Sequence, residues 1–209
     1  MSRRAVLALL AGLAAFAGAA AGVRAAEPAG DAARGRALFA QRQCARCHLP
    51  LEQGPGTGPA LETVRSPQGA LELSGRLWSH APAMAAAFER EGIGWPRLSP
   101  QDAADLLAYL QADPARDAAP DLFRGQVTLV RKGCLKCHRL RGEGGEVAPD
   151  LTAYGDRYAS AVDWAAAVWN HAPRMAGVAA RLEVLYPRFS GDEMAHLVGF
   201  LRRDAAEGR

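Results

Sequence analysis

The sequence has no excess of charge of one sign once its first 25 residues are set aside. The chain has 25 basic and 22 acidic side chains. Three of the basic ones, Arg3, Arg4 and Arg24, lie in that N-terminal stretch, which leaves equal numbers of the two signs. A surface for nucleic acid needs a clear surplus of Lys and Arg. The composition therefore argues against nucleic-acid binding.

Cysteine is scarce, and all four cysteines lie in two Cys-x-x-Cys-His stretches, at residues 44–48 and 134–138. None is left over for a separate disulfide. A zinc ribbon uses two such pairs with a much shorter gap between them. A thioredoxin-like redox pair belongs in a strand–helix context rich in β-branched residues, whereas alanine and leucine surround both stretches here. Neither alternative explains a histidine directly after each pair.

The spacing is instead typical of covalent haem attachment. Two thiols one turn apart can form thioethers with the two vinyl groups of one haem, while the next imidazole reaches the iron from the same side. The sequence thus predicts two covalently bound haem c groups. The predicted attachment residues and proximal iron ligands are Cys44, Cys47 and His48, and Cys134, Cys137 and His138.

Long apolar runs are also missing, except at the N-terminus. Residues 5–23 carry no charge, Arg3 and Arg4 precede them, and small residues around Ala25 suit cleavage. Residues 1–25 are therefore predicted to be a secretory signal peptide, which places the mature protein in the periplasm. Because the run is mostly alanine and glycine, an uncleaved membrane anchor is the weaker alternative.

The chain contains an internal repeat with an offset of 90 or 91 residues. The matching segments are 33–35 with 123–125, 59–61 with 149–151, 77–84 with 168–175, and 95–99 with 186–190. Two domains are predicted, residues 26–113 and 121–209. Residues 114–120, bounded by prolines, are expected to form the linker.

Each half is predicted to be helical. We expect an opening helix at 31–41 and 121–130, a middle helix near 78–90 and 162–170, and a last helix that begins after Ser99 or Ser190, since both serines fit an N-cap with a carboxylate three residues on. Apolar residues of the last helices recur at helical spacing and are expected in the core. Met194 is predicted to be a core residue, and His196, which aligns with Asp105, a surface residue.

The order of these features resembles the class I cytochrome c fold, twice over. The shared features are the attachment stretch after a glycine-containing helix, a proline-x-leucine, a downstream methionine and a last helix with an aromatic residue. The resemblance extends over nearly all of residues 26–209 and implies an all-α protein of two tandem domains, each wrapped around one haem. It also implies that the first and last helices cross at Gly35 and Gly125, against Tyr109 and Phe200. By the same resemblance, Pro59 and Pro149 offer a backbone carbonyl to the proximal histidine.

The sixth iron ligand has two candidates in each half. The resemblance favours Met84 and Met175, and the proline two residues earlier suits a loop that presents a thioether. His80 and His171 are equally duplicated and are rival distal ligands; otherwise they would organise that loop through a hydrogen bond. Arg97 and Arg188, with Trp95 and Tyr186, are candidates for contact with haem propionates, with a solvated arginine as the alternative.

Two ligand pairs predict an electron-transfer protein rather than an enzyme. The design resembles two-domain dihaem cytochromes c that feed terminal oxidases in bacterial periplasms. A haem subunit docked on a periplasmic or membrane oxidoreductase is the alternative, and a dihaem peroxidase, which needs one open distal site, is less favoured. The partners are expected to be redox proteins. Basic residues around the second attachment stretch predict an acidic partner there: Arg131, Lys132, Lys136, Arg139 and Arg141.

Overall fold

The computed structural model describes residues 28–54, 56–158 and 160–207. The predicted signal peptide lies outside these residues. Within them the protein is mostly helical, as predicted, with two short two-stranded sheets. No helix in the described ranges is both long and apolar enough to cross a membrane.

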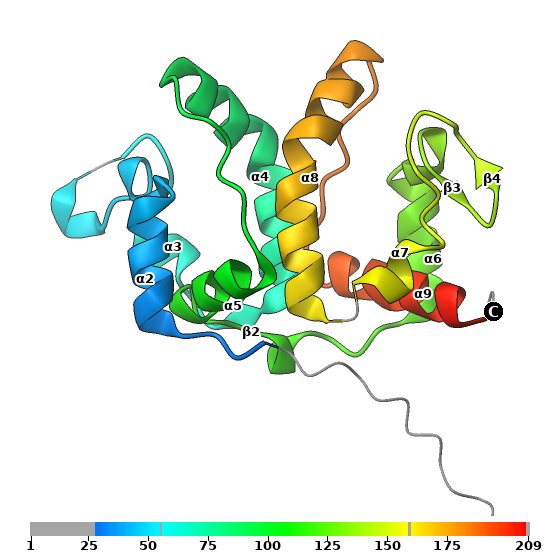
Figure 1. The fold of residues 1–209 in the computed structure, drawn as a ribbon, viewed down its shortest axis with the longest axis horizontal. Helices are drawn as coiled ribbons and strands as arrows, with labels where there is room; N and C mark the ends of the chain where they lie inside the picture. The colour runs from blue at the N-terminus through cyan, green and yellow to red at the C-terminus, as the bar shows by residue number, and fades with distance from the viewer. Residues whose placement is uncertain (1–27, 55, 159, 208–209) are drawn as a thin grey trace, which may run out of the picture.

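The first half, residues 28–113, and the second half, residues 121–207, repeat the same order of main helices (Figure 1). The helices of the first half are α2 (Ala32–Gln41), α3 (Leu61–Val64), α4 (Ala70–Arg90) and α5 (Pro100–Tyr109). Those of the second half are α6 (Leu122–Arg131), α7 (Tyr154–Arg157), α8 (Ala161–Arg181) and α9 (Glu193–Glu207). The short 3₁₀ turns are η1 (Cys44–Arg46), η2 (Leu51–Gln53), η3 (Pro114–Arg116) and η4 (Cys134–Lys136).

Two small sheets complete the fold. Strand β1 (Gln68–Gly69) pairs in parallel with β2 (Ala112–Asp113), and β3 (Arg139–Leu140) pairs antiparallel with β4 (Glu143–Gly144). The first joins the start of α4 to the end of the first half. The second forms a hairpin directly after the second attachment stretch.

The helix starts follow from local sequence. Asp31 accepts hydrogen bonds from the backbone N–H groups of Ala33 and Arg34, at 2.8 and 2.9 Å, and so satisfies donors that the helix itself cannot. Asp121 does the same for α6 through Arg124 N. The predicted box at Ser99 is confirmed, with Ser99 Oγ accepting from Asp102 N at 3.0 Å.

The opening helix of each half crosses the last helix closely, as the resemblance implied. A Cβ at Gly35 would overlap the backbone carbonyl of Asp105, and one at Gly125 would overlap that of His196. The β-carbons of Tyr109 and Phe200 lie just beside these contacts. Only a residue without a side chain permits such an approach.

The middle helices are longer than predicted and contain the residues that were expected in a loop. Pro82 lies inside α4 and Pro173 inside α8, so the expected loop at Met84 and Met175 is wrong. Proline inside a helix leaves the carbonyl four residues earlier without its helical donor. In α8 this carbonyl belongs to Trp169, and it accepts the indole N–H of Trp95 at 3.2 Å.

The two halves share one hydrophobic core. Helices α4 and α8 stand side by side in the middle of the molecule, with α2 and α5 on one side and α6 and α9 on the other (Figure 1). The buried cluster runs without a break from Phe39 to Leu201 and includes Met194, as predicted. His196, expected on the surface, is 3% exposed; that expectation is wrong because α9 turns this side chain toward α6.

The segment between the halves packs against both of them. Asp117 Oδ1 accepts from Leu71 N at the start of α4, at 2.7 Å. Pro120 lies against Gly199 of α9. Residues 114–120 thus contact the first half through Asp117 and the second half through Pro120.

Candidate functional site

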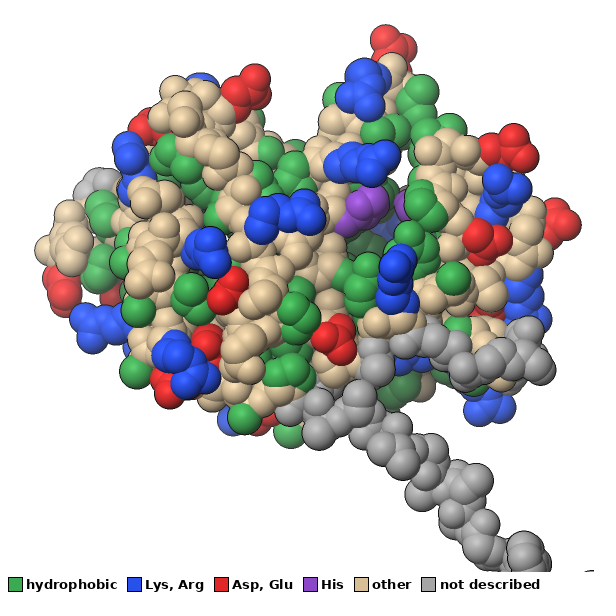
Figure 2. Space-filling view, viewed as in Figure 1, with side chains coloured by type: hydrophobic (Ala, Val, Ile, Leu, Met, Phe, Trp, Pro, Cys, Tyr) green, Lys and Arg blue, Asp and Glu red, His purple; other side chains and the backbone are tan. Residues whose placement is uncertain are grey.

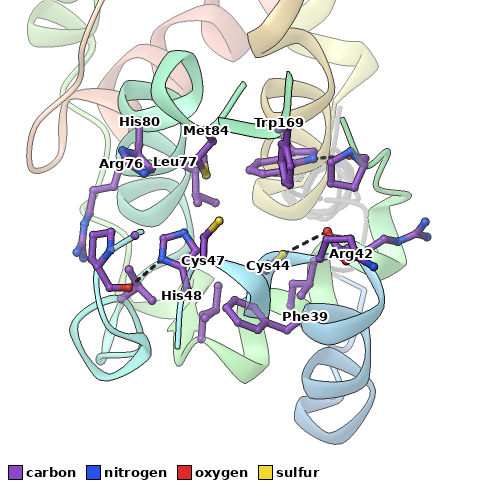
Figure 3. A pocket seen from close by; sticks show the side chains of 18 of the residues that line it. Phe39, Arg42, Cys44, Cys47, His48, Arg76, Leu77, His80, Met84 and Trp169 are labelled. Atoms are coloured by element: carbon purple, nitrogen blue, oxygen red, sulfur yellow. Dashed lines mark hydrogen bonds between the residues drawn. The ribbon is translucent and has the colours of Figure 1, made fainter. Parts of the chain in front are cut away.

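Each Cys-x-x-Cys-His stretch forms one tight turn directly after the opening helix. The chain enters it through a residue in the left-handed region, Gln43 with φ 67° or Gly133 with φ 70°. The turn closes through a hydrogen bond from His48 N to Cys44 O at 3.0 Å, and its counterpart from His138 N to Cys134 O at 2.9 Å. In the first half this geometry places both thiols and the imidazole around one cavity, as Figure 3 shows. In the second half, Cys134 and His138 border the cavity.

None of the four cysteines is in a disulfide bond. Burial raises the pKa of Cys44 and that of Cys134 to about 11. A redox-active pair needs a thiolate, which an environment of lowered pKa provides. The surroundings of these two thiols are the opposite, which disfavours a thioredoxin-like function.

The proximal histidines are held by proline carbonyls. His48 Nδ1 lies 2.9 Å from Pro59 O, and His138 Nδ1 lies 2.9 Å from Pro149 O. Because a carbonyl oxygen only accepts, Nδ1 must carry the proton in each ring. The lone pair is therefore left on Nε2, the nitrogen that a metal ion would use.

A second histidine faces each proximal one across the cavity. The ring centroids of His48 and His80 lie 6.3 Å apart with an interplanar angle of 60°, and those of His138 and His171 repeat both values. Two metal–nitrogen bonds of about 2 Å each, plus the distance of about 1 Å from each nitrogen to its ring centre, give about 6 Å. Each histidine pair thus fits one iron held between its rings.

The methionines lie one helical turn further along the same helices. Met84 borders the first cavity and Met175 the second. Figure 3 shows His80 and Met84 on the same side of the cavity, opposite His48. Both ligand assignments stay predictions: the ring distances suit histidine ligation, and the methionines border the same cavities.

The pKa of the second histidine of each half, His80 on α4 and His171 on α8, is lowered. Burial lowers the pKa of His80, and the neighbouring His48 ring lowers it further. His171 shows the same direction, with burial first and His138 second. Both imidazoles are therefore kept neutral. The loop that these two histidines were expected to organise is helical instead, because both lie within helices.

The cavities differ in size and in charge. The first has a volume of about 410 Å³ and the second about 240 Å³. Both are bordered mainly by apolar side chains, and the first also by Arg42, Arg76 and Arg90. Figure 2 shows histidine side chains at the bottom of a hollow on this face, with apolar and basic side chains around it.

The arginines predicted to contact propionates, Arg97 and Arg188, do not border either cavity, although burial lowers the pKa of His80 and the charge of Arg188 contributes to this. Arg97 is absent from the residues that border the first cavity, and its Nη1 lies 3.4 Å from the carbonyl oxygen of Asn170 in the other half. Propionate contacts of Arg97 and Arg188 stay a prediction. Arg42, Arg76 and Arg90 are the guanidinium groups at the first cavity, and sequence reasoning missed them because two of them lie within the long α4.

Two tryptophans at the cavities were also missed. Trp169 of α8 borders the first cavity, and Trp78 of α4 borders the second. The signal was present, since both belong to the duplicated Trp-x-His-Ala-Pro segments. Only the packing of α4 against α8 shows that each indole reaches the opposite half.

Comparison with known proteins gives one family match. No curated protein matches the chain. Residues 32–112 match the family model described as Cytochrome c. Together with the attachment turn and the held imidazole inside that stretch, this match supports a c-type cytochrome, a haem electron-transfer protein with covalently bound haem c.

Proposed function

We propose that this protein is a periplasmic dihaem c-type cytochrome that passes electrons between redox partners through two closed haem sites. One observation carries the proposal: the full set of side chains occurs twice. Each half has an attachment turn, an imidazole held by a proline carbonyl, and a second imidazole 6.3 Å away. The family match covers the first of these sites, and the repeat extends the argument to the second.

The bound haem supplies an iron that gains or loses one electron. The residues of the protein orient the haem ligands and exclude water. The proline carbonyls fix the tautomer and the orientation of His48 and His138. The apolar side chains around each cavity exclude water, and the packed helices hold both imidazoles in place, so that little needs to rearrange when the charge of the site changes.

The distal ligands in this proposal are His80 and His171. The same ring distance of 6.3 Å in both halves supports this assignment. An iron held by both imidazoles of a pair would keep no open position for peroxide. This arrangement favours an electron carrier over a dihaem peroxidase.

The proposal also includes a partner that docks at the second site. Three of the five basic residues there are in ion pairs: Lys132 with Glu193 at 2.7 Å, Arg139 with Glu146 at 3.6 Å, and Arg141 with Asp204 at 2.9 Å. Arg131 and Lys136 are exposed. An acidic redox protein would meet these two side chains, and its encounter rate would fall as salt is added.

The test is to purify the holoprotein together with two double variants, Cys44→Ala/Cys47→Ala and Cys134→Ala/Cys137→Ala, and to measure covalent haem per chain and reversible reduction. The wild type should hold two haems, and each double variant one. A wild type with a single haem would contradict the dihaem proposal. Rapid peroxide turnover would favour the enzyme alternative.

The distal ligand is tested by a matched pair of variants on one helix face, His80→Ala and Met84→Ala. We expect His80→Ala to convert one of two ferric haems from low spin to high spin in the electron paramagnetic resonance spectrum. Met84→Ala should leave both haems low spin. The reverse result would restore the methionine assignment, and His171→Ala with Met175→Ala repeats the test in the second half.

A further inference from the structure

The segments that follow α4 and α8 cross over to the opposite half. Residues 95–98 of the first half lie against α8, and residues 186–189 of the second half lie against α4. Trp169 Nε1 donates to Pro96 O at 2.7 Å, and Trp78 Nε1 donates to Pro187 O at 2.8 Å. The two contacts use equivalent residues of the repeat, so the crossing is reciprocal.

Further hydrogen bonds fix each crossing segment. Asn170 Nδ2 donates to Leu98 O at 2.7 Å, and Asn170 Oδ1 accepts from Leu98 N at 3.0 Å. At the equivalent place, Ser79 Oγ accepts from Phe189 N at 2.8 Å and donates to Phe189 O at 3.1 Å. Different side chains thus make the same pair of backbone contacts in the two halves.

Aromatic stacks lie at the centre of both crossings. The rings of Trp95 and Trp169 stack with centroids 4.3 Å apart, and those of Trp78 and Tyr186 with centroids 5.1 Å apart. Offset stacks at such distances stabilise beyond the area that they bury. Trp78 and Trp169 are both 8% exposed or less, so their indoles are held firmly.

Each held indole forms part of the wall of the cavity in the opposite half. Trp169 borders the cavity of Cys44, His48 and His80, where Figure 3 shows it beside Met84. Trp78 borders the second cavity and stacks on His171, with centroids 6.4 Å apart and an angle of 29°. Neither cavity is therefore closed by its own half alone.

We propose that Trp169 is a haem-site residue of the first half and Trp78 a haem-site residue of the second, so that each half completes the haem site of the other. The inference rests on the dihaem function proposed above. An apolar wall keeps water from the metal and disfavours its more highly charged ferric form. Loss of the Trp169 indole should accordingly lower the reduction potential of the haem on Cys44 and Cys47.

The test compares two tryptophans on the same helix. Trp164 and Trp169 both lie on α8, but Trp164 borders the second cavity and Trp169 the first. In the ferric holoprotein the haem methyl signals are assigned to each haem through nuclear Overhauser contacts with its own cysteines. Trp169→Leu should move the signals of the haem on Cys44 and Cys47, and Trp164→Leu those of the haem on Cys134 and Cys137.

A second measurement needs no variant. In the wild-type holoprotein, the indole protons of Trp169 should show Overhauser contacts with the haem on Cys44 and Cys47. The inference is overturned if Trp169→Leu shifts only the second haem, or both haems equally, or if these contacts are missing. Covalent haem is counted first, so that a chain with one haem contradicts the dihaem function separately, while the Trp169 contact can still be measured at the ring on Cys44 and Cys47.

Discussion

Where the opening helix of each half crosses the last helix, a backbone N–H group donates a hydrogen bond to a buried side chain. That side chain differs between the two halves. In the first half, Asp105 Oδ1 accepts from Asp31 N at 2.8 Å where α5 crosses α2. In the second, His196 Nδ1 accepts from Asp121 N at 3.1 Å where α9 crosses α6. The crossing requires a buried acceptor for the N–H group before the opening helix, and either a carboxylate or a neutral imidazole can supply it.

Asp105 and His196 differ in the other hydrogen bonds that they make. Asp105 also binds the Arg34 guanidinium through contacts of 2.8 and 2.9 Å, and this hydrogen bonding is the main reason why its pKa is lowered. His196 Nε2 is buried without a hydrogen-bond partner among the described residues. The first half therefore has a carboxylate paired with an arginine at the position where the second half has an imidazole nitrogen.

The largest expected effect concerns the independence of the halves. The double variant Cys44→Ala/Cys47→Ala removes one haem, and because one core and two crossing segments join the halves, both should lose stability. We expect a single unfolding transition, lowered by about 10 °C or more, which corresponds to a loss of several kcal/mol. Thermal unfolding followed at the remaining haem and by far-ultraviolet circular dichroism measures this. Two separate transitions would show that the halves unfold independently.

The next effect concerns the helix crossing. Gly35→Val would force a side chain into the carbonyl of Asp105 and should cost about 3 kcal/mol of the free energy of unfolding. Gly177→Ala is the matched control, because a Cβ there meets only the Arg181 guanidinium at 3.6 Å within α8. It should be neutral or stabilise by up to about 1 kcal/mol. Denaturant unfolding of the two holoproteins compares them, and equal losses would refute the close crossing.

Asp105→Asn should cost about 1 to 2 kcal/mol near neutral pH, a value reduced because Arg34 is more than half exposed. The folded-state pKa of Asp105 lies below the unfolded value of about 3.9. Its contribution is therefore present above that value and is lost as the pH falls through the lower folded-state pKa.

Denaturant unfolding between neutral and acid pH tests this prediction, and the variant should show a weaker loss of stability on the acid side than the wild type. Glu146→Gln is the control, since its carboxylate is 81% exposed and should change stability little. If Asp105→Asn leaves the acid dependence unchanged, the charge of the Asp105 carboxylate does not contribute to stability.

The smallest expected effect lies at the entrance to the attachment turns. Gly133→Ala should cost about 1 kcal/mol, because Gly133 has a positive φ that side chains disfavour. Gln43→Gly, at the equivalent position of the first half, should change stability by less or increase it slightly. Chemical denaturation of both variants measures the difference. A larger loss for Gln43→Gly would mean that its side chain makes a contribution of its own.

Much of the fold could be predicted because local signals and the repeat agreed. The box at Ser99 and the helical spacing predict the last helix of the first half, and the resemblance predicts the glycine at each crossing; the structure confirms both. The prediction for the middle helix of the first half misses residues 70–77 at its start, and that for the second half ends at residue 170, before Pro173, although α8 continues to Arg181. In α8, an indole of the other half binds the carbonyl that this proline leaves free, a contact that no single segment of sequence reveals.

In the candidate sites, too, some features could be predicted from the sequence and others could not. The attachment turns follow from spacing and the proline carbonyls from the resemblance to class I cytochrome c. The choice between His80 and Met84 follows from neither, since residues four apart share a helix face. The exchange of Trp78 and Trp169 between the halves depends on how α4 packs against α8. His196 was misplaced because its polarity indicated the surface, although the crossing helices needed an acceptor.

The most direct test of the central claim, two covalent haems in one chain, is the intact mass of the denatured holoprotein. The account predicts a single species that carries two haems, both retained after acid–acetone extraction because thioethers survive it. A species with one haem, or with haem that is extracted, would contradict it.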